Sequence, residues 1–381
     1  MKYKIPEKIE SEISKCNQCG KCLSVCPTYW ITNDECDSAR GLLELIKNAN
    51  TGNLPITQKY LEHLYRCSSC RACAEVCPSN IAIFEVIDWA KCRILEVRSE
   101  KLSAQRRDLA KGGAVRKIPY TAVTEDWKTY VNKQLVKKQN RESFLKSIPE
   151  IVGKKTAKHR VGFFIGCLMD IGYQDTAKNI VNWLVNQNYA VVIPKGQECC
   201  GMPAISLGAI DAAKDKIANN IRVFTQAKVK TIVTGCPHCA VMIRDKWSSI
   251  AGNLPFQVIH IAELVAKSGI NPDAGKHKGE RVGYQPACHL HRALGLPSNL
   301  NTIFKKPIPN YIETKNSISC CGQAGINGFL YPEIATQIAS RQVNRLNRAK
   351  LDCLLTNCPW CNLIFDKQKD KQFILRSLIE Y

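Results

Sequence analysis

Cysteine dominates the chemistry available to this sequence, because 21 of its 381 residues are cysteine. Two similar segments carry eight of them, CNQCGKCLSVCP at residues 16–27 and CSSCRACAEVCP at residues 67–78. Disulfide frameworks suit small secreted domains. This chain is long, and its charged start, MKYKIPEKIESEISK, lacks the apolar middle of a signal peptide. The cysteines therefore predict metal ligation.

Each segment has three cysteines separated by two residues, a fourth cysteine after three more residues, and then a proline, Pro27 or Pro78. This spacing is typical of proteins with two [4Fe–4S] cubane clusters, in which the fourth cysteine of each run binds the other cluster. A zinc site made of four cysteines, the alternative, needs two cysteine pairs. We therefore predict one cubane on Cys16, Cys19, Cys22 and Cys77, and another on Cys67, Cys70, Cys73 and Cys26.

Two adjacent cubanes pass single electrons and have no open coordination position for a substrate. Positive side chains near a cluster favour its more negative reduced state, so we expect them to raise its reduction potential. The basic neighbours of the two runs are Lys15, Lys21, Arg66 and Arg71.

The remainder of the chain contains an internal repeat. RVGFFIGC ends at Cys167 and RVGYQPAC at Cys288, and the segments ECCG and SCCG carry the adjacent pairs of each copy. The first three pairs of matching cysteines are 121 residues apart and the last two pairs are 122 apart, which indicates a duplication. The two pentads are Cys167, Cys199, Cys200, Cys236 and Cys239, then Cys288, Cys320, Cys321, Cys358 and Cys361.

Adjacent cysteines rarely form a disulfide with each other, because the geometry is strained. They can direct two thiolates at a cluster wider than a single ion, and Gly201 and Gly322 allow a tight turn just after each pair. A structural zinc ion held by four of the five thiolates is the alternative for one or both pentads.

Short β-rich runs lead into these cysteines, namely VGFFIG, YAVVIP, TIVTG, RVGYQ and CLLTN. An apolar face at Ala177, Ile180, Val181, Leu184 and Val185 predicts a helix between two of them. The alternation predicts two small α/β units with ligands on loops at strand ends. Around the first two runs the pattern is helical, as in ARGLLELIKNA and PITQKYLEHLYRC.

The expected architecture is therefore multidomain. We predict a mainly α ferredoxin-like domain at 1–98, a basic helical connector at 99–157, and two duplicated cysteine-rich α/β domains at 158–275 and 276–381. Residues 101–160 hold 16 Lys and Arg against 5 Asp and Glu. This connector is either a solvated linker or a docking strip for an acidic partner subunit or lipid headgroups.

The doubled cluster run and the two pentads together resemble the cysteine-rich "CCG" proteins of anaerobic electron transfer. These include the iron–sulfur subunits of glycolate oxidase, D-lactate dehydrogenase and anaerobic glycerol-3-phosphate dehydrogenase, and the catalytic subunit of heterodisulfide reductase. DSARGLLELIK and CCGQAGINGFLYPEIA resemble the dehydrogenase subunits. In those subunits the last Cys-x-x-Cys of a repeat is often incomplete, whereas both pentads here are complete, as in heterodisulfide reductase. That likeness implies one noncubane [4Fe–4S] cluster per pentad.

The resemblance implies an electron-transfer subunit that carries electrons from a FAD-containing dehydrogenase partner, acting on a 2-hydroxy acid or similar substrate, to a quinone-reactive or membrane subunit. The alternative is a chain that itself reduces a disulfide substrate between its two pentad clusters. We expect no flavin or nucleotide on this chain, because it has no Gly-rich binding signature.

The formal net charge of +21 counts every cysteine as neutral, whereas metal-bound thiols are thiolates, so much of this excess would be matched internally. A zinc protein that binds nucleic acid is therefore not favoured, and no aromatic or Arg cluster for base stacking lies among the ligands. Without an apolar run of about 18 residues, we expect a cytoplasmic protein with at most peripheral membrane contact.

Several residues outside the ligand sets could still contribute. His238, His289 and His291 could each donate a hydrogen bond to a cluster sulfur, carry protons, or simply pack. Three cysteines fall outside every motif and are expected to be free buried thiols, Cys36, Cys92 and Cys353. Trp183 and Trp360 are core candidates.

Overall fold

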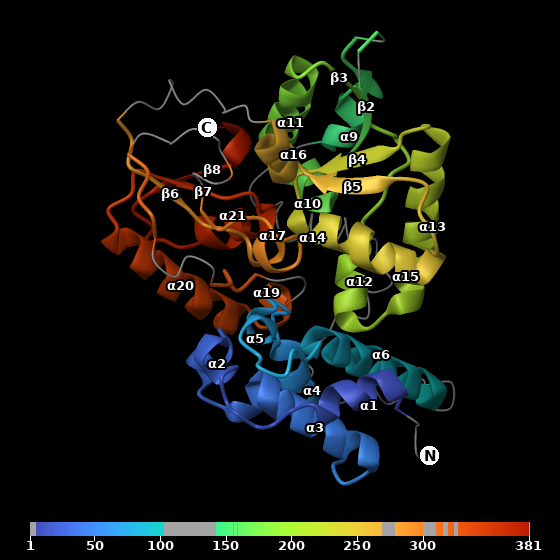
Figure 1. Cartoon of the computed structure of the whole chain (residues 1–381), viewed down its shortest axis with the longest axis vertical. Helices are drawn as coiled ribbons and strands as arrows, with labels where there is room; N and C mark the ends of the chain where they lie inside the picture. Colours follow the sequence, from blue (N-terminus) through green and yellow to red (C-terminus); the bar gives the residue numbers. More distant parts are fainter. Residues whose placement is uncertain are drawn as a thin grey trace. The chain divides into compact units, whose positions relative to one another are not determined.

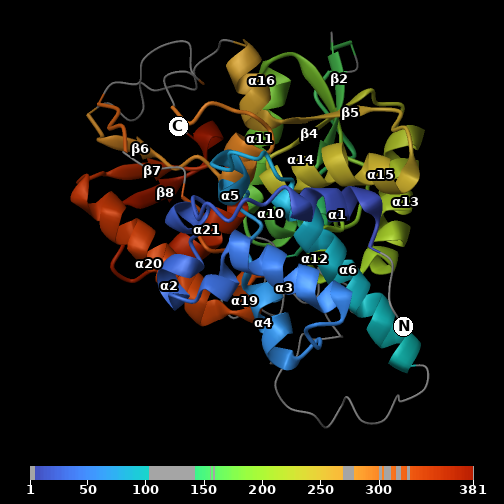
Figure 2. The same ribbon diagram turned by 60° about the horizontal axis from the view of Figure 1, so that its bottom comes forward.

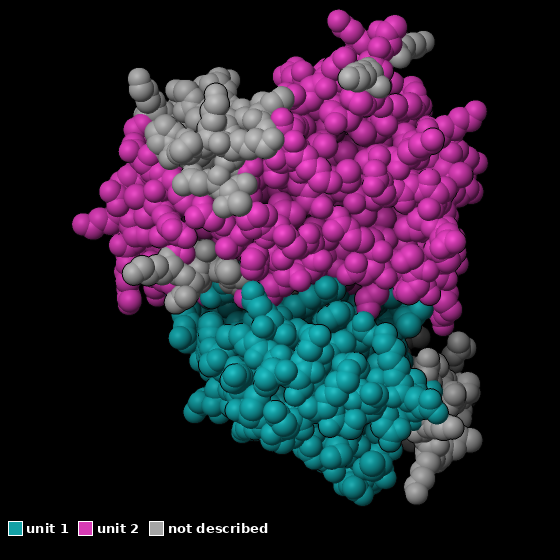
Figure 3. Space-filling view, viewed as in Figure 1, with its two compact units in different colours: residues 1–124, 203–210, 319–341 teal, residues 125–202, 211–318, 342–381 magenta. Residues whose placement is uncertain are grey.

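The computed structural model of the chain describes most of its residues (Figure 1), namely 5–102 (95–102 by their backbone), 142–154, 156–157, 159–268, 279–299, 303, 310–314, 319–323 and 327–380. Most of the predicted basic connector, residues 103–141, lies outside the described residues. The chain forms two compact units (Figure 3), unit 1 with residues 1–124, 203–210 and 319–341, and unit 2 with residues 125–202, 211–318 and 342–381.

Unit 1 is built from helices, and no strand occurs among its described residues. In its N-terminal part α6 packs against both α1 and α3 (Figure 2). The elements of this part are α1 (Glu7–Ser14), η1 (Leu23–Val25), α2 (Tyr29–Thr32), η2 (Glu35–Asp37), α3 (Ala39–Thr51), α4 (Gln58–Arg66), α5 (Ala72–Glu75) and α6 (Ile83–Leu102).

The two helices predicted from ARGLLELIKNA and PITQKYLEHLYRC are α3 and α4. Each begins at a side-chain cap, since the Ser38 hydroxyl accepts a hydrogen bond from the Gly41 amide and the Thr57 hydroxyl accepts one from the Tyr60 amide, both at 3.2 Å. Helix α3 ends at Gly52, whose φ of +83° is left-handed. The apolar faces of both helices form the core of this part.

Unit 1 also takes in two segments from the repeat region, one shortly after the pair Cys199–Cys200 and one that includes the pair Cys320–Cys321. They carry most of α12 (Met202–Leu207), all of α19 (Asn327–Leu330) and the first part of α20 (Pro332–Arg348). The Tyr65 hydroxyl donates a hydrogen bond to the Leu207 carbonyl at 2.9 Å, and the Arg341 guanidinium lies 4.8 Å from the centre of the Trp30 ring. The helical unit is therefore assembled from three separate stretches of sequence.

The first sheet of unit 2 has five strands in the order β1–β3–β2–β4–β5. All neighbouring strands pair in parallel except the edge strand β1, which is antiparallel to β3. The sequence patterns predicted β2, β3 and β4 but neither β1 nor β5. The strands are β1 (Ile151–Val152), β2 (His159–Phe164), β3 (Tyr189–Val192), β4 (Thr231–Thr234) and β5 (Gln257–His260).

The second sheet has three strands in the order β6–β7–β8, which corresponds to β2–β4–β5 of the first sheet. Its strands, β6 (Val282–Tyr284), β7 (Cys353–Leu355) and β8 (Ile374–Arg376), are parallel neighbours in sequence order. Tyr311 pairs in parallel with Val282, in the place that β3 takes beside β2. The internal repeat seen in the cysteines is therefore also a repeat of strand topology.

Helices and turns of unit 2 surround the two sheets (Figure 1). The predicted apolar face of α11 is buried at Ala177, Ile180, Val181 and Leu184. Trp360 is buried as expected, but Trp183 is only half-buried, because it lies at the flank of that face. The elements are α9 (Phe144–Ser147), α10 (Cys167–Ile171), α11 (Gln174–Asn186), α13 (Ile210–Gln226), α14 (Pro237–Val241), η3 (Met242–Trp247), α15 (Ser248–Ala251), α16 (Ile261–Ser268), α17 (Cys288–Arg292), α21 (Pro359–Asp366) and η5 (Leu378–Glu380).

An aromatic cluster lies at the centre of the first repeat. The rings of Phe164 and Trp247 meet edge to face with centroids 5.9 Å apart, and Phe224 and Phe256 complete the cluster.

In the part of the chain that the structure describes, no helix combines the length and apolar character needed to cross a membrane.

A glycine pair tests the packing of the 203–210 segment in unit 1. Gly52 and Gly208 have φ of +83° and +85°, but a Cβ on Gly208 would lie 2.4 Å from the Lys91 backbone, whereas one on Gly52 would meet nothing within 4 Å. We expect Gly52→Ala to cost about 1–2 kcal/mol from the left-handed φ alone, and Gly208→Ala to cost about 2–5 kcal/mol because overpacking is added. Anaerobic urea unfolding measures both, and equal losses would contradict this packing.

Candidate metal centres

The first four-cysteine group of unit 1 lines one cavity, which contains Cys16, Cys19, Cys22 and Cys77. The loop between the first three cysteines has left-handed residues at Gln18 and Gly20, with φ of +60° and +76°. Arg40 holds the loop, since its guanidinium donates a hydrogen bond to the Gln18 carbonyl at 2.8 Å. A Cβ on Gly20 would lie 3.2 Å from the same guanidinium, so glycine leaves room for Arg40.

The second group lines another cavity of unit 1, which contains Cys26, Cys67, Cys70 and Cys73. Its loop has left-handed residues at Ser69 and Arg71, with φ of +49° and +61°, at the positions that match Gln18 and Gly20. The two loops thus repeat a backbone conformation as well as a sequence. Each cavity combines three cysteines of one run with the last cysteine of the other, which is the partition that the spacing predicts.

Burial governs the protonation of the second group. It raises the pKa of Cys26 to about 12 and the pKa of Cys73 well above its usual range. Burial also raises the pKa of Cys67, where the nearby Lys91 ammonium acts in the opposite direction. These thiols hold their protons until a metal displaces them.

Lys91 is a buried cation that the sequence patterns did not reveal. It is 3% exposed, and its ammonium lies 5.5 Å from the centre of the Tyr65 ring. Three of the basic residues predicted to tune the clusters have other partners. Lys15 pairs with Glu12, Arg66 with Asp37, and Arg71 stacks over the Phe84 ring.

The first pentad gathers at one edge of the five-stranded sheet. Cys167 follows the carboxyl end of β2, Cys199 and Cys200 follow β3, and Cys236 and Cys239 follow β4. Strands β3 and β4 lie on opposite sides of β2, and the carboxyl edge where the chain order switches sides is where open α/β sheets bind ligands. The pentad therefore occupies the usual ligand position of this topology.

Side chains from distant helices hold the adjacent cysteine pair in place. The Asn220 amide donates a hydrogen bond to the Cys199 carbonyl at 3.1 Å and accepts one from the Glu198 amide at 2.8 Å. The Trp247 indole donates a hydrogen bond to the Cys200 carbonyl at 2.9 Å. Sequence reasoning did not find Asn220 or Trp247, because neither lies near a cysteine in the sequence.

The five thiols of the first pentad are all linked by hydrogen bonds. The hydrogen bond with Cys167 is the main reason that the pKa of Cys199 lies well below its usual range, while the pKa of Cys167 is raised. Burial raises the pKa of Cys236, but hydrogen bonds with Cys239 and His238 outweigh it and lower that pKa. Cys200 is hydrogen-bonded to both Cys199 and Cys239, and so connects the pair Cys167–Cys199 with the pair Cys239–Cys236. Two of the five sulfurs are thus favoured as thiolates.

The cysteines of the second pentad belong to both units. Cys288, Cys358 and Cys361 are part of unit 2, and a hydrogen bond with Cys361 helps to lower the pKa of Cys358 to about 7 against the effect of burial. Cys320 and Cys321 are part of unit 1, where both are buried and the Gly322 amide donates a hydrogen bond to the Cys320 sulfur at 3.3 Å.

Two buried histidines of unit 2 lie beside cysteines of the pentads. The rings of His238 and His289 have centroids 4.2 Å apart. His238 hydrogen-bonds with Cys236 of the first pentad and Cys358 of the second, and His289 Nδ1 lies 3.4 Å from the Cys288 sulfur. Burial lowers the pKa of His238, but the two cysteine contacts raise it to about 10 overall. His291 instead packs locally, with Nδ1 2.8 Å from the Leu296 carbonyl.

Three further cysteines were expected to be free buried thiols. Cys353 is buried in β7, and burial raises its pKa to about 11. Cys36 and Cys92 are only half-buried, so the expectation was wrong for them. Neither lies in a strand of the duplicated sheets, as Cys353 does.

His260, at the carboxyl end of β5, was not singled out in the sequence, and burial lowers its pKa to about 4.

The donor sets fit iron–sulfur clusters. Each cavity of unit 1 offers four thiols, the number a cubane needs. The first pentad offers five hydrogen-bonded thiols, one more than a tetrahedral zinc ion uses. Bound iron would serve as a one-electron carrier, and the cysteines named above would hold it.

Comparisons with known proteins agree with this organisation. The sequence matches the "Cysteine-rich domain" family twice, at residues 161–244 and 282–366, and the "4Fe-4S dicluster domain" family at residues 12–81. It is 28% identical to an uncharacterized iron–sulfur protein of Methanocaldococcus jannaschii over 94% of this chain, which spans 68% of that relative.

Two other relatives match along most of their own length. The glycolate oxidase iron-sulfur subunit of Escherichia coli is 24% identical, with 91% of this chain and 88% of that protein covered. A subunit of the dihydromethanophenazine:CoB–CoM heterodisulfide reductase of Methanosarcina acetivorans is also 24% identical, with 92% and 87% covered. The chain therefore belongs to the iron–sulfur proteins in which a 4Fe-4S dicluster domain is followed by two copies of the cysteine-rich domain.

Proposed function

We propose that this chain is the electron-transfer subunit of a multi-subunit oxidoreductase, with two cubanes in unit 1 and an iron–sulfur cluster in each pentad. The observation that carries the proposal is the grouping of eight cysteines into two cavities that share ligands between the runs. Such interlocked ligation keeps two clusters adjacent, which suits stepwise transfer of single electrons.

The partner we propose is a FAD-containing dehydrogenase that oxidises a 2-hydroxy acid or a similar substrate. Support comes from the glycolate oxidase iron-sulfur subunit, which matches this chain over 91% of its length. Electrons would enter at the cubanes and leave through the pentad clusters to a quinone or another carrier, with a membrane subunit as an additional partner.

A second candidate makes the pentads catalytic. A disulfide would take two electrons, delivered singly through the cubanes, and two protons, and would leave as two thiols. The heterodisulfide reductase relative and the completeness of both pentads favour this candidate. His238 adds a structural observation, because one side chain hydrogen-bonds with a cysteine of each pentad.

Crossed ligation can be tested with paired cysteine variants. Cys77→Ser should lose about four of roughly 16 irons per chain, because one cubane holds four. Adding Cys19→Ser should remove no further iron, since both residues belong to the same proposed cluster. Combining Cys77→Ser with Cys70→Ser instead should double the loss of iron, because the two cysteines belong to different proposed clusters. Iron analysis and EPR of anaerobic protein measure this.

Cys92→Ala, which removes a cysteine of α6 outside both cavities, is the control and should retain all the iron. The reverse pattern, in which Cys77→Ser and Cys70→Ser together lose no more iron than either alone, would show that each run binds its own cluster.

A disulfide titration separates the two candidate functions. Under the electron-transfer proposal, adding a panel of low-molecular-weight disulfides to the reduced anaerobic protein should leave the EPR signals of the pentad clusters unchanged in shape. Those signals would change under the catalytic alternative, because each cluster would take one sulfur of the substrate. A change abolished by Cys199→Ser and Cys358→Ser would favour the second candidate.

Lys91 should raise the potential of the cluster on Cys26, Cys67, Cys70 and Cys73, since a buried positive charge stabilises the reduced state. Lys91→Met should lower that potential by tens of millivolts, because it removes a positive charge that acts on Cys67 of this group. A redox titration followed by EPR measures it, with the exposed Lys47→Met as control. Equal potentials in all three proteins would exclude this role.

A further inference from the structure

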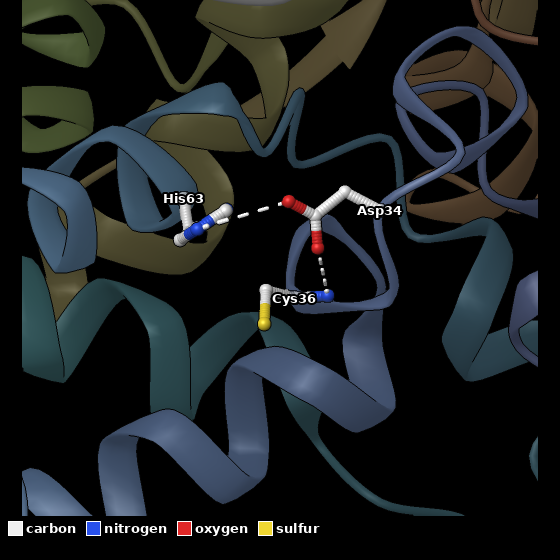
Figure 4. Close-up of side chains that lie close together, drawn as sticks. All are labelled: Asp34, Cys36 and His63. Carbon is white, nitrogen blue, oxygen red and sulfur yellow. Dashed lines mark hydrogen bonds and ion pairs between the residues drawn. The ribbon is translucent and has the colours of Figure 1, made fainter.

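A compact group of metal-binding side chains lies outside all the predicted ligand sets (Figure 4). Asp34, Cys36 and His63 each offer one ligand atom, and these atoms all lie within 4.8 Å of one another. Asp34 directly precedes η2, Cys36 lies in η2, and His63 comes from α4, so two separate elements of unit 1 bring the group together.

The histidine is oriented by a buried carboxylate. His63 Nδ1 lies 2.7 Å from Asp37 Oδ1, and the side chain of Asp37 is fully buried. Arg66 holds the other oxygen of Asp37 at 3.3 Å. With the Nδ1 proton donated to Asp37, the ring presents Nε2 as its remaining nitrogen. Metal-binding histidines commonly have this arrangement, with a carboxylate on the nitrogen that does not bind the metal.

The remaining nitrogen faces an oxygen that it does not contact directly. His63 Nε2 lies 4.0 Å from Asp34 Oδ2, beyond hydrogen-bond distance. Two acceptor atoms that face each other at this distance leave a place for a cation between them. The other oxygen, Asp34 Oδ1, accepts a hydrogen bond from the Cys36 amide at 3.0 Å, which orients the carboxylate and fixes Cys36 beside it.

The structure assigns a mononuclear divalent-cation site to Asp34, Cys36 and His63, and the donor set selects zinc. One imidazole, one thiolate and one carboxylate are the ligand types that zinc accepts, with water in the fourth position. Tetrahedral zinc with bonds of about 2.0–2.3 Å holds its ligands roughly 3.3–3.8 Å apart. The half-exposed Asp34 side chain can close the difference by moving inward.

The site adjoins the second cysteine group of unit 1 through one residue. Asp37, which orients His63, also lines the cavity of that group, and its carbonyl accepts a hydrogen bond from the Cys26 sulfur at 3.6 Å. A single thiolate cannot hold a cubane, so the site is separate from the iron–sulfur ligands. Its occupancy would add positive charge beside a cluster of the electron-transfer path.

Zinc binding to the full, cluster-loaded chain tests the assignment. Chelator-treated anaerobic protein is titrated with ZnSO4, and bound zinc, iron and the zinc X-ray absorption spectrum are measured. We expect one equivalent of zinc bound by a single sulfur and by nitrogen and oxygen ligands. Cys36→Ala should lose this equivalent and keep its iron, whereas Cys353→Ala, the matched cysteine control, should keep both.

Asp34→Asn guards against a folding artefact, because the asparagine oxygen can still accept the Cys36 amide while the negative ligand is lost. This variant should retain wild-type iron and bind zinc at least tenfold more weakly. The assignment is overturned if the wild type binds no zinc, if the spectrum shows sulfur ligands alone, or if Cys36→Ala binds zinc as the wild type does.

Discussion

The constraint on which this structure depends is that many thiol protons must be displaced from sulfurs that are buried. Burial raises the pKa of Cys26, Cys67 and Cys73, so unit 1 holds neutral thiols until metal replaces their protons. The first pentad meets the same demand differently, since hydrogen bonds among its thiols favour thiolate at Cys199 and Cys236. In these two groups, metal binding would therefore be coupled to the release of thiol protons.

The positions of the ligands follow from elementary rules of chain geometry. In unit 1, left-handed residues on both sides of the second cysteine turn each loop around its cavity. In unit 2, parallel strands bring cysteines from three loops to one sheet edge. Proline at the first helical position after Cys236 and Cys358 starts a helix at each of these cysteines. The fold thus needs little specific packing to gather the sulfurs, and uses Asn220 and Trp247 to hold them.

Periodic and local features of the sequence predicted most of this arrangement. The spacing of the runs predicted how eight cysteines divide between two cavities, and β-rich runs predicted β2, β3, β4, β6 and β7. Strands β1, β5 and β8 do not lead into a cysteine of the pentads, so they were missed. Lys91, Asn220, Trp247 and His63 act across long sequence separations, which no local pattern records. The same reason explains why the segments 203–210 and 319–341 could not be assigned to unit 1 from sequence.

Duplication produced two pentads, but their surroundings are not equivalent. His238 and Trp360 occupy matching positions of CPHC and CPWC, and their rings meet edge to face with centroids 6.0 Å apart. His289 matches Leu168 in the first copy. The His238 ring also lies beside the His289 ring, whereas the counterparts of the two histidines, Trp360 and Leu168, are apolar. A symmetric pair of clusters would have no preferred direction for an electron, whereas the His238 ring, which hydrogen-bonds with Cys236 and Cys358, is a polar group that the matching position of the other copy lacks. With clusters bound in both pentads, this asymmetry would let the two duplicated domains differ in reduction potential and in access to protons.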